Sequence, residues 1–326
     1  MQTGRLCPGR ERCAALRTPF VRPGGAPPVR SRIVCVGNLV HDEVFRVDAL
    51  PASGIKTGVQ GYESRFGGPA ATAAVAICHL GGAASYWGRV GADAAGEAAI
   101  RIMGEHGVDC AGIAIIAEGR TLRAIVLVDD RGERSIVSDR RSLPLDASVL
   151  PIDPLDDVAV VLADTRWPAG AKIALDRARN AGIPTVLDAD GGSHDDNERL
   201  IEASDHVVFS SEGLRDFAGD GAPENLLRRF ARRRGQVLGV TRGAGGSLWL
   251  LDGEIVAIPA FKVVMADTTG CGDVFHGAYA LGLGEGMTPL EAARLASAAA
   301  ALKGKRARGW NGMPDRAAVT SLMDIG

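Results

Sequence analysis

The stretch Ala266-Asp267-Thr268-Thr269-Gly270-Cys271-Gly272-Asp273-Val274-Phe275-His276-Gly277-Ala278-Tyr279-Ala280 places a glycine turn directly before an apolar segment, 277–283, that predicts a buried helix. A turn that enters a helix leaves backbone N–H groups unpaired at the positive end of the helix dipole, where phosphate groups bind. Asp273 follows the turn, and a carboxylate beside an anion site is useful when it takes a proton from an attacking hydroxyl. The stretch therefore favours phosphoryl transfer to an alcohol over the simpler alternative, a helix with a capping Asp.

Composition narrows the possible partners. The chain has 326 residues, 46% of them hydrophobic, and a formal net charge of −2, which favours neither nucleic acid nor an anionic membrane as a partner. We expect a cytoplasmic protein with reduced thiols, because its six cysteines are scattered without CxxC spacing. No uncharged apolar run reaches the length of about eighteen residues that would span a membrane. Residues 1–30 are rich in Arg, Pro and Gly, and we interpret them as a disordered extension.

Strands and helices alternate along much of the chain. Residues 32–37 predict a buried strand, and from residue 158 onward short apolar runs alternate with amphipathic helices. This rhythm is typical of a parallel sheet with helices on both faces, whose ligands lie beyond the carboxyl ends of the strands. Polar residues gather at those ends, namely Asp164, Arg166, Asp188, Asp190 and 210–212.

Two segments, about 43–66 and 118–140, lie outside this alternation and predict a small β-sheet lid over the cleft. The second one contains a hairpin-like turn at 129–132. Arginines cluster around it: Arg123, Arg134, Arg140 and Arg141. Such a cluster is either a solvated surface or, on a lid that faces a cleft, a planar clamp for anionic groups.

The string DTTGCGD, residues 267–273, resembles the second signature of the ribokinase, or PfkB, family of carbohydrate kinases. GGPAATAA, residues 67–74, with Gly81 and Gly91, resembles the first signature, in which Thr72 stands where an Asn is usual. The resemblance implies a three-layer α/β/α domain over residues 31–326 with a β-sheet lid. It also implies ATP and Mg²⁺ as cofactors, with Asp273 as the catalytic base and with Gly270, Cys271 and Gly272 as donors of amide N–H groups.

The resemblance, the polar residues at the strand ends and the arginines of the lid together suggest binding residues. The expected sugar-binding residues are Asp42, Lys56, Gly67, Gly68, Thr72, Arg123, Arg140, Arg141, Asp164 and Arg166. The expected nucleotide-binding residues are Thr241, Gly243, Gly245, Gly246 and Ser210. Taken alone, the glycine-rich loop 241–246 is also consistent with a tight hairpin. Asp42, taken alone, is about equally consistent with an ordinary turn residue.

The metal ligands are the point where the sequence departs from the family. The Asn-x-x-Glu motif that organises the magnesium waters should fall at 210–213, and it is missing. Asp188, Asp190 or Glu212 could replace it, and the residues alone do not choose among them. Asp267 and Thr269 resemble a loop that binds a monovalent cation in some family members, which implies K⁺.

Within the family, the resemblance is greatest to kinases that phosphorylate 6-deoxy-6-sulfofructose at its 1-hydroxyl. It rests on residues 67–76, 161–167, 187–190, 204–206 and 259–263. The acceptor could also be another ketose, a sugar acid, a phosphorylated sugar or a nucleoside, and the missing Asn-x-x-Glu leaves open a catalytically silent sugar-binding regulator. We further expect a homodimer formed through the lid, because an exposed sheet face or edge invites pairing.

Overall fold

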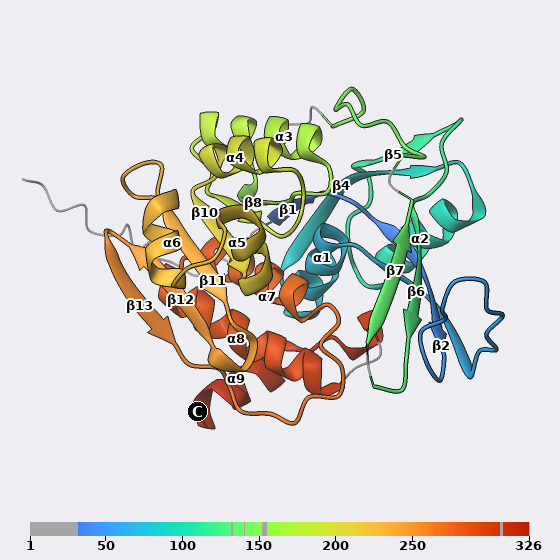
Figure 1. Cartoon of the computed structure of the whole chain (residues 1–326). Coiled ribbons are helices and arrows are strands. Elements are labelled where there is room, and N and C mark those ends of the chain that lie inside the picture. Colours follow the sequence, from blue (N-terminus) through green and yellow to red (C-terminus); the bar gives the residue numbers. More distant parts are fainter. Residues whose placement is uncertain (1–31, 132, 140, 152–154, 307–308, 326) are drawn as a thin grey trace, which may run out of the picture.

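The computed structural model describes residues 32–131, 133–139, 141–151, 155–306 and 309–325, so the expected extension 1–30 lies outside the described residues. Within this part of the chain, a nine-stranded sheet has the order β13-β12-β11-β10-β9-β8-β1-β4-β5 (Figure 1). All neighbouring strands from β11 to β5 run parallel, whereas β12 and β13 pair antiparallel at one edge. The strands of this sheet are β1 Arg32–Val36, β4 Ala83–Gly91, β5 Ile113–Ile116, β8 Val158–Asp164, β9 Thr185–Asp188, β10 His206–Ser210, β11 Val237–Thr241, β12 Ser247–Leu251 and β13 Glu254–Ile258.

Helices cover both faces of this sheet. Alternation along β1 shows the division, because Ile33 and Cys35 pack into one core, whereas Val34 and Val36 pack into the other. The first core contains residues of α1 Pro69–His79, α2 Ala94–Glu105, α7 Cys271–Gly284, α8 Pro289–Arg306 and α9 Arg316–Ile325. The second contains residues of α3 Pro168–Asn180, α4 His194–Ala203, α5 Ser211–Ala218 and α6 Pro223–Phe230. The expected three-layer α/β/α architecture is confirmed.

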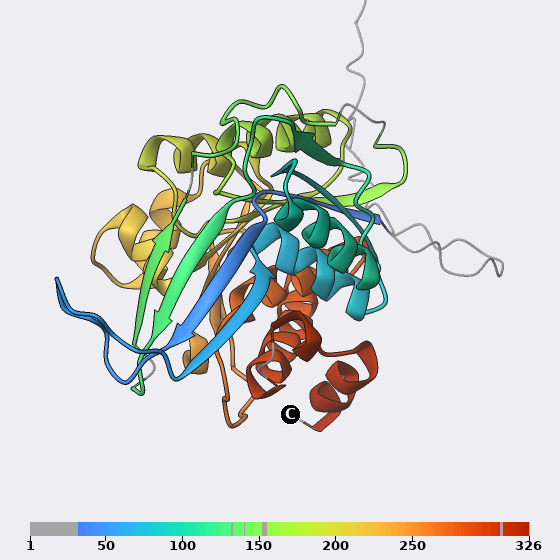
Figure 2. The same cartoon turned by 90° about the vertical axis from the view of Figure 1, so that its right-hand side faces the viewer.

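A second sheet of four strands, in the order β3-β2-β6-β7, stands beside the main sheet (Figures 1 and 2). Its strands are β2 Val40–Arg46, β3 Gly61–Gly67, β6 Arg123–Val128 and β7 Arg134–Ser138. Both β2–β3 and β6–β7 are antiparallel hairpins, and β2 pairs with β6 in parallel. This sheet is the expected lid.

The structure also contains helix ends and short elements that the sequence pattern does not specify. Helix α6 buries Leu226, Leu227 and Phe230 and ends at Phe230, because the backbone of Ala231 is already extended. Helices α5 and α9 and strand β13 were not anticipated. No helix in the described part of the chain is long and apolar enough to cross a membrane.

Candidate active site

The turn before α7 has the form that its glycines predict. Gly270 is the N-cap of the helix and has a φ of 76°, a left-handed conformation that glycine adopts without strain. The N–H of Cys271 donates to the carbonyl oxygen of Thr268 at 3.2 Å, whereas those of Gly272 and Asp273 have no acceptor among the described residues. Two unpaired N–H groups at a helix N-terminus can hold a phosphate oxygen.

Asp273 lies in the first turn of α7 and is half-buried. Burial raises its pKa to about 6, and the negative charges of Asp164 and Asp190 act in the same direction, whereas His276 and Arg166 lower it. A carboxylate with this pKa is ionised at neutral pH yet is a stronger proton acceptor than an ordinary Asp. Asp273 is thus suited to the role of a general base.

The side chain of His276 contacts both the first turn of α7 and the central sheet. One ring nitrogen, Nδ1, lies 2.7 Å from the carbonyl oxygen of Gly272 and 3.3 Å from Asp188 Oδ2. The other, Nε2, lies 3.2 Å from the carbonyl oxygen of Val208 in β10. The ring is buried, so these contacts fix the direction in which the turn presents its amides.

Acidic side chains converge beside Asp273 from the carboxyl ends of two paired strands. Asp164 ends β8 and Asp188 ends β9, and the two residues are register partners. Burial, together with the charges of Asp190, Asp273 and Asp164, raises the pKa of Asp188 well above its usual range. Asp164, Asp188 and Asp190, which were expected at the carboxyl ends of the strands, lie together beside Asp273.

Asp164 is occupied by backbone donors. Its carboxylate accepts the N–H groups of Asn38 at 3.2 Å, Ala70 at 3.1 Å and Arg166 at 2.8 Å. It is buried, and it joins the end of β1, the start of α1 and the end of β8. These bonds make Asp164 an organiser of the site floor and leave it little capacity for a sugar hydroxyl.

The acidic side chains near Asp273 could bind Mg²⁺ through water molecules. The described residues contain no group of three His, Cys, Asp or Glu side chains placed to hold a metal ion. Asp188 Oδ1 is nevertheless buried without a hydrogen-bond partner, and Asp190 Oδ1 accepts the N–H of Ser210 at 2.7 Å. Glu212 is exposed in the first turn of α5. Because Mg²⁺ keeps several of its waters, Asp188 and Asp190 fit an ion held through water.

The loop that leads into the turn is held by two cations of the chain. Asp267 Oδ1 accepts the N–H of Thr269 at 2.9 Å and lies 3.2 Å from the guanidinium of Arg134 in the lid. The ammonium of Lys303 in α8 donates to the carbonyl oxygen of Thr269 at 3.3 Å. The acceptors that the resemblance assigned to K⁺ thus already face positive side chains.

Cys271 is an inert thiol in this turn. Burial raises its pKa to about 11, although Lys303 lowers it, so that the thiolate is scarce at neutral pH.

Asp42 belongs to the lid and faces the glycine pair. A Cβ atom added to Gly67 would lie 2.9 Å from Asp42 Oδ2, and one added to Gly68 would lie 2.2 Å from the carbonyl oxygen of Asn38. Burial raises the pKa of Asp42 to about 6, while Arg65 lowers it. The Asp42 carboxylate makes no hydrogen bond to another described residue. It is therefore available to bind a sugar hydroxyl.

Thr72 lies beside the glycine turn that precedes α7. A Cβ atom added to Gly270 would lie 3.6 Å from Thr72 Cγ2 and 3.9 Å from Asp273 Oδ2. The Thr72 hydroxyl accepts the indole N–H of Trp310 at 3.1 Å, and both side chains are buried. Trp310 is a neighbour of the site that the sequence analysis missed.

The lysine and arginine residues that were expected to bind the sugar do not lie together in the structure. Lys56 is exposed in the connection between β2 and β3, and Arg141 is exposed after β7. Arg166 is half-buried near the acids. Arg140 lies outside the described residues.

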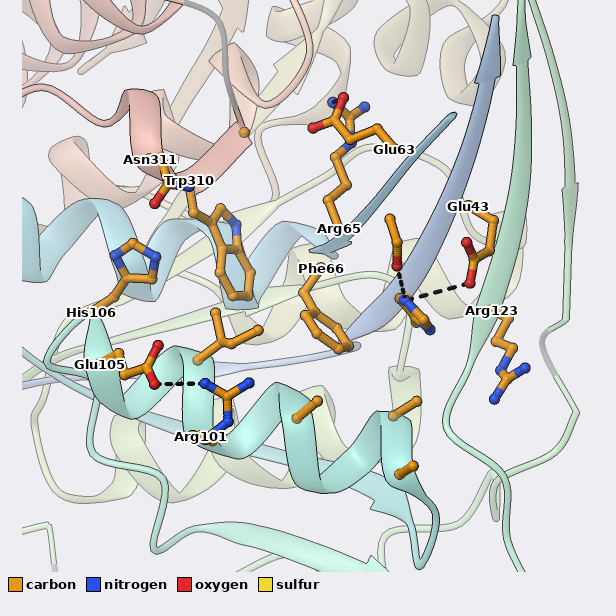
Figure 3. A pocket seen from close by; sticks show the side chains of 17 residues that line it. Glu43, Glu63, Arg65, Phe66, Arg101, Glu105, His106, Arg123, Trp310 and Asn311 are labelled. Atoms are coloured by element: carbon orange, nitrogen blue, oxygen red, sulfur yellow. Dashed lines mark hydrogen bonds and ion pairs between the residues drawn. The ribbon is translucent and has the colours of Figure 1, made fainter. Parts of the chain in front are cut away.

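Arg123 lines a cavity of about 690 Å³ that is separate from Asp273 (Figure 3). The cavity lies between the lid, α2 and the 3₁₀ turn Gly309–Gly312. In the lid, His41 and Arg123 are register partners, and so are Asp42 and Ala124. Because neighbouring residues of a strand point to opposite faces, Arg123 and Asp42 lie on opposite faces of the lid.

The expected nucleotide loop follows β11. Gly243–Gly245 form a 3₁₀ turn, exposed to solvent, after Thr241. Gly246 has a φ of 77° and its Cα lies so close to β13 that an added Cβ would be 2.1 Å from the carbonyl oxygen of Ile258. Ser210 ends β10 beside Thr241, but its hydroxyl caps α5 by accepting the N–H of Gly213 at 2.9 Å.

An α/β/α domain with unpaired N–H groups at a helix N-terminus, an adjacent carboxylate of raised pKa and a β-sheet lid has the form of a phosphoryl-transfer enzyme. A family model described as pfkB family carbohydrate kinase matches residues 30–315. The chain belongs to this family, and it is an ATP-dependent carbohydrate kinase of the ribokinase and fructokinase type.

Individual relatives agree with this assignment. A ribokinase of Lactococcus lactis is 25% identical over 287 residues, which cover 87% of this chain and 94% of the relative. The crystal structure of a candidate ribokinase from Agrobacterium tumefaciens is 33% identical, with a TM-score of 0.83, over 90% of this chain and 98% of that chain. An Arabidopsis thaliana ribokinase complexed with ribose and ATP shares the fold, with a TM-score of 0.81 and 23% identity over 91% of this chain and 99% of that chain.

Proposed function

We propose that this kinase transfers the γ-phosphate of ATP to a primary hydroxyl of a ketose-type sugar. The observation that carries the proposal is the place of Asp273, a carboxylate with a pKa of about 6 in the first turn of α7, next to the unpaired N–H groups of that turn. The related ribokinase that was solved with ribose and ATP supports both ligand classes.

In the proposed reaction, Asp273 accepts the proton of the sugar hydroxyl as its oxygen attacks the γ-phosphorus. The bond from that phosphorus to the bridging oxygen of ATP breaks, and ADP leaves. General-base catalysis of this kind is worth about 10²–10⁴ in rate. The N–H groups of Gly272 and Asp273 hold the oxygens of the migrating phosphoryl group. Asp188 and Asp190 would hold Mg²⁺ through water, and the ion would supply positive charge against the phosphates.

The acceptor that we propose to test first is 6-deoxy-6-sulfofructose, phosphorylated at its 1-hydroxyl. Asp42 would bind sugar hydroxyls, because its carboxylate is half-buried and makes no hydrogen bond to another described residue. Its charged register partner Arg65 lies on the same face of the lid. Lys56 lies at the tip of that hairpin and would reach a sulfonate if the tip folds over the cleft.

A nucleoside is the second candidate acceptor. An aromatic or apolar lid surface would suit a flat base, but Val44, Ala124 and Val126 on the Asp42 face are buried, and the lid is rich in arginine, so a nucleoside ranks below a sugar. A catalytically silent regulator is the third possibility, and the intact Asp273 argues against it.

The decisive assay couples ADP release to a panel of sulfofructose, fructose, ribose, sugar acids and nucleosides, with Asp273→Asn as the control. We expect turnover on a ketose that the control variant loses. Turnover on nucleosides alone would contradict the sugar assignment, and a lack of turnover on every acceptor would favour the silent regulator.

We also propose a homodimer formed through the lid. Ile125 and Val137 pair across β6 and β7 and are 46% and 69% exposed, on the face opposite Asp42. Burying this apolar face against a second copy would remove it from water. Light scattering of the wild-type protein should give twice the mass of one chain, whereas the Val137→Lys variant should give the mass of a single chain. A wild-type protein that is monomeric would refute the proposal.

A cytoplasmic location is proposed as well, because Cys35, Cys110 and Cys271 are free thiols. Cell fractionation that recovers the protein outside the cytoplasm would contradict it.

A further inference from the structure

Lys303 is a charged side chain inside the protein core. It lies in the last turn of α8 and is 1% exposed, which places it among the largest fully buried side chains. Lysine is almost never fully buried without a partner, because its ammonium loses its hydration. Its ammonium donates a hydrogen bond to the carbonyl oxygen of Thr269 at 3.3 Å. The residue that accepts this bond directly precedes Gly270, the N-cap of α7.

The end of α8 is joined to the same loop at further points. The N–H groups of Ala266 and Asp267 both donate to the carbonyl oxygen of Gly304, at 2.8 and 3.1 Å. A Cβ atom added to Gly304 would lie 3.2 Å from Cys271 Sγ, so the helix end touches the turn itself. Lys303 is therefore part of a packed junction that sets the position of the phosphate-binding turn.

The charge of Lys303 acts on Asp267, which forms an ion pair with Arg134. Burial raises the pKa of Asp267, but its bonds to Thr269 and the charges of Arg134 and Lys303 bring that pKa below its usual value. Asp267 thus stays ionised between two cations, one from α8 and one from the lid. Asp267 is half-buried, so these two cations balance a carboxylate that still reaches water.

A monovalent metal ion does not fit this arrangement. Its oxygen ligands would be the carbonyl of Thr269 and the carboxylate of Asp267, and both already face positive side chains. A further cation beside the ammonium of Lys303 would be repelled inside a medium of low dielectric constant. The chain instead carries the positive charge itself.

We propose that the buried ammonium of Lys303 is a built-in cation that positions the phosphate-binding turn, so that this kinase needs no monovalent metal ion there. The inference rests on the proposed function insofar as the turn holds the phosphates of ATP. Lys303 acts through the turn and is a positioning residue. The positive charge of Lys303 lies close to the turn that we propose to hold the phosphates of ATP. This charge attracts the negative phosphates and so favours nucleotide binding.

The experiment measures the affinity for a non-hydrolysable ATP analogue with Mg²⁺ by calorimetry, in buffers of choline, Na⁺, K⁺ or NH₄⁺ chloride at equal ionic strength. For the wild-type protein we expect the same Kd in all four buffers, within about twofold. Lys303→Ala removes the charge and leaves room for an ion. It should weaken binding about tenfold or more in choline, the effect of a lost charged hydrogen bond, and K⁺ or NH₄⁺ should restore most of it.

Two further variants isolate the charge. Lys303→Met fills the volume without charge, so we expect the same loss of affinity without rescue by K⁺. Lys305→Ala changes an exposed lysine of the same helix and should match the wild type in every buffer. In assays of sugar phosphorylation under the same conditions, the KM for ATP should change in parallel with the Kd for the nucleotide analogue.

Two outcomes overturn the inference. One is a wild-type Kd that tightens about tenfold when K⁺ replaces choline, a comparison that needs no variant. The other is a folded Lys303→Ala protein that binds the nucleotide as the wild type does, or whose loss K⁺ and NH₄⁺ leave unchanged. If the affinities behave as expected but no sugar is phosphorylated, the proposed function fails and the role of Lys303 stands.

Discussion

Replacing Asp273 with Asn should remove activity and stabilise the fold at the same time. The pKa of Asp273 rises from an ordinary 3.8 to about 6, chiefly through burial. Each pH unit of such a rise corresponds to about 1.4 kcal/mol, so the ionised carboxylate destabilises the native state by about 3 kcal/mol. An amide of the same shape carries no charge and should recover much of that free energy of unfolding.

The sign of the effect fixes its pH dependence. Because the folded pKa lies above the unfolded one, the wild-type protein is most stable with Asp273 protonated and loses that stability as the pH rises from about 4 to about 6. The variant lacks this loss. We expect its Tm to exceed that of the wild type by about 5 °C at pH 8, and the gap to close near pH 4.

Differential scanning calorimetry across this pH range, paired with the coupled ADP assay, measures both effects. Turnover of Asp273→Asn should fall by about 10²–10⁴. Wild-type kcat/KM should decline below about pH 6 as Asp273 is protonated. Asp216→Asn, at an exposed position of α5, is the matched control and should change neither quantity. Normal turnover by Asp273→Asn, or a Tm difference that does not vary with pH, would refute the reasoning.

Three further changes test the framework of the site. Gly68→Ala should abolish folding or activity, because the new Cβ would stand 2.2 Å from the carbonyl oxygen of Asn38 at a φ of 103°; a soluble variant with normal kinetics would count against this geometry. Asp164→Asn should lower the free energy of unfolding by about 1–3 kcal/mol in denaturant titrations, because its NH2 group would face backbone N–H donors and leave them unpaired. This cost should exceed the gain from removing a buried charge, whose presence is reflected in the raised pKa of Asp164. A loss below about 0.5 kcal/mol would show that the carboxylate does not organise the floor. Arg134→Met removes a partly exposed lid contact to Asp267 and should raise the sugar KM less than about fivefold; a hundredfold rise would mean that Arg134 itself binds the acceptor.

The glycine turn before α7 could be predicted because its signal is local. A glycine turn, an acid and an apolar run within fifteen residues specify a helix N-terminus with a carboxylate, and the structure has Gly270 and Asp273 in those places. The alternation of strands and helices likewise predicted the parallel sheet, because each element buries its own apolar residues.

Residues whose roles depend on distant partners could not be predicted. A lysine near the end of a helix is usually predicted to be solvated, but Lys303 is 1% exposed, because the end of α8 packs against the loop 266–269. Asp164 was assigned to the sugar because it ends a strand, whereas its donors Asn38 and Ala70 lie 126 and 94 residues away.

The lid shows a second limit. Its strands alternate weakly, and a register shift of one residue would exchange the face of Asp42 with that of His41 and Arg123. The sequence therefore placed Arg123 in the lid but could not tell which face it occupies.

The most direct test is a crystal structure of the complex with Mg²⁺, a non-hydrolysable ATP analogue and the sugar that the panel identifies. We predict that the terminal phosphate lies on the N–H groups of Gly272 and Asp273. The Asp273 carboxylate should then lie about 2.6–3.2 Å from the hydroxyl that receives the phosphate. A terminal phosphate bound elsewhere, or an acceptor hydroxyl out of reach of Asp273, would contradict the account.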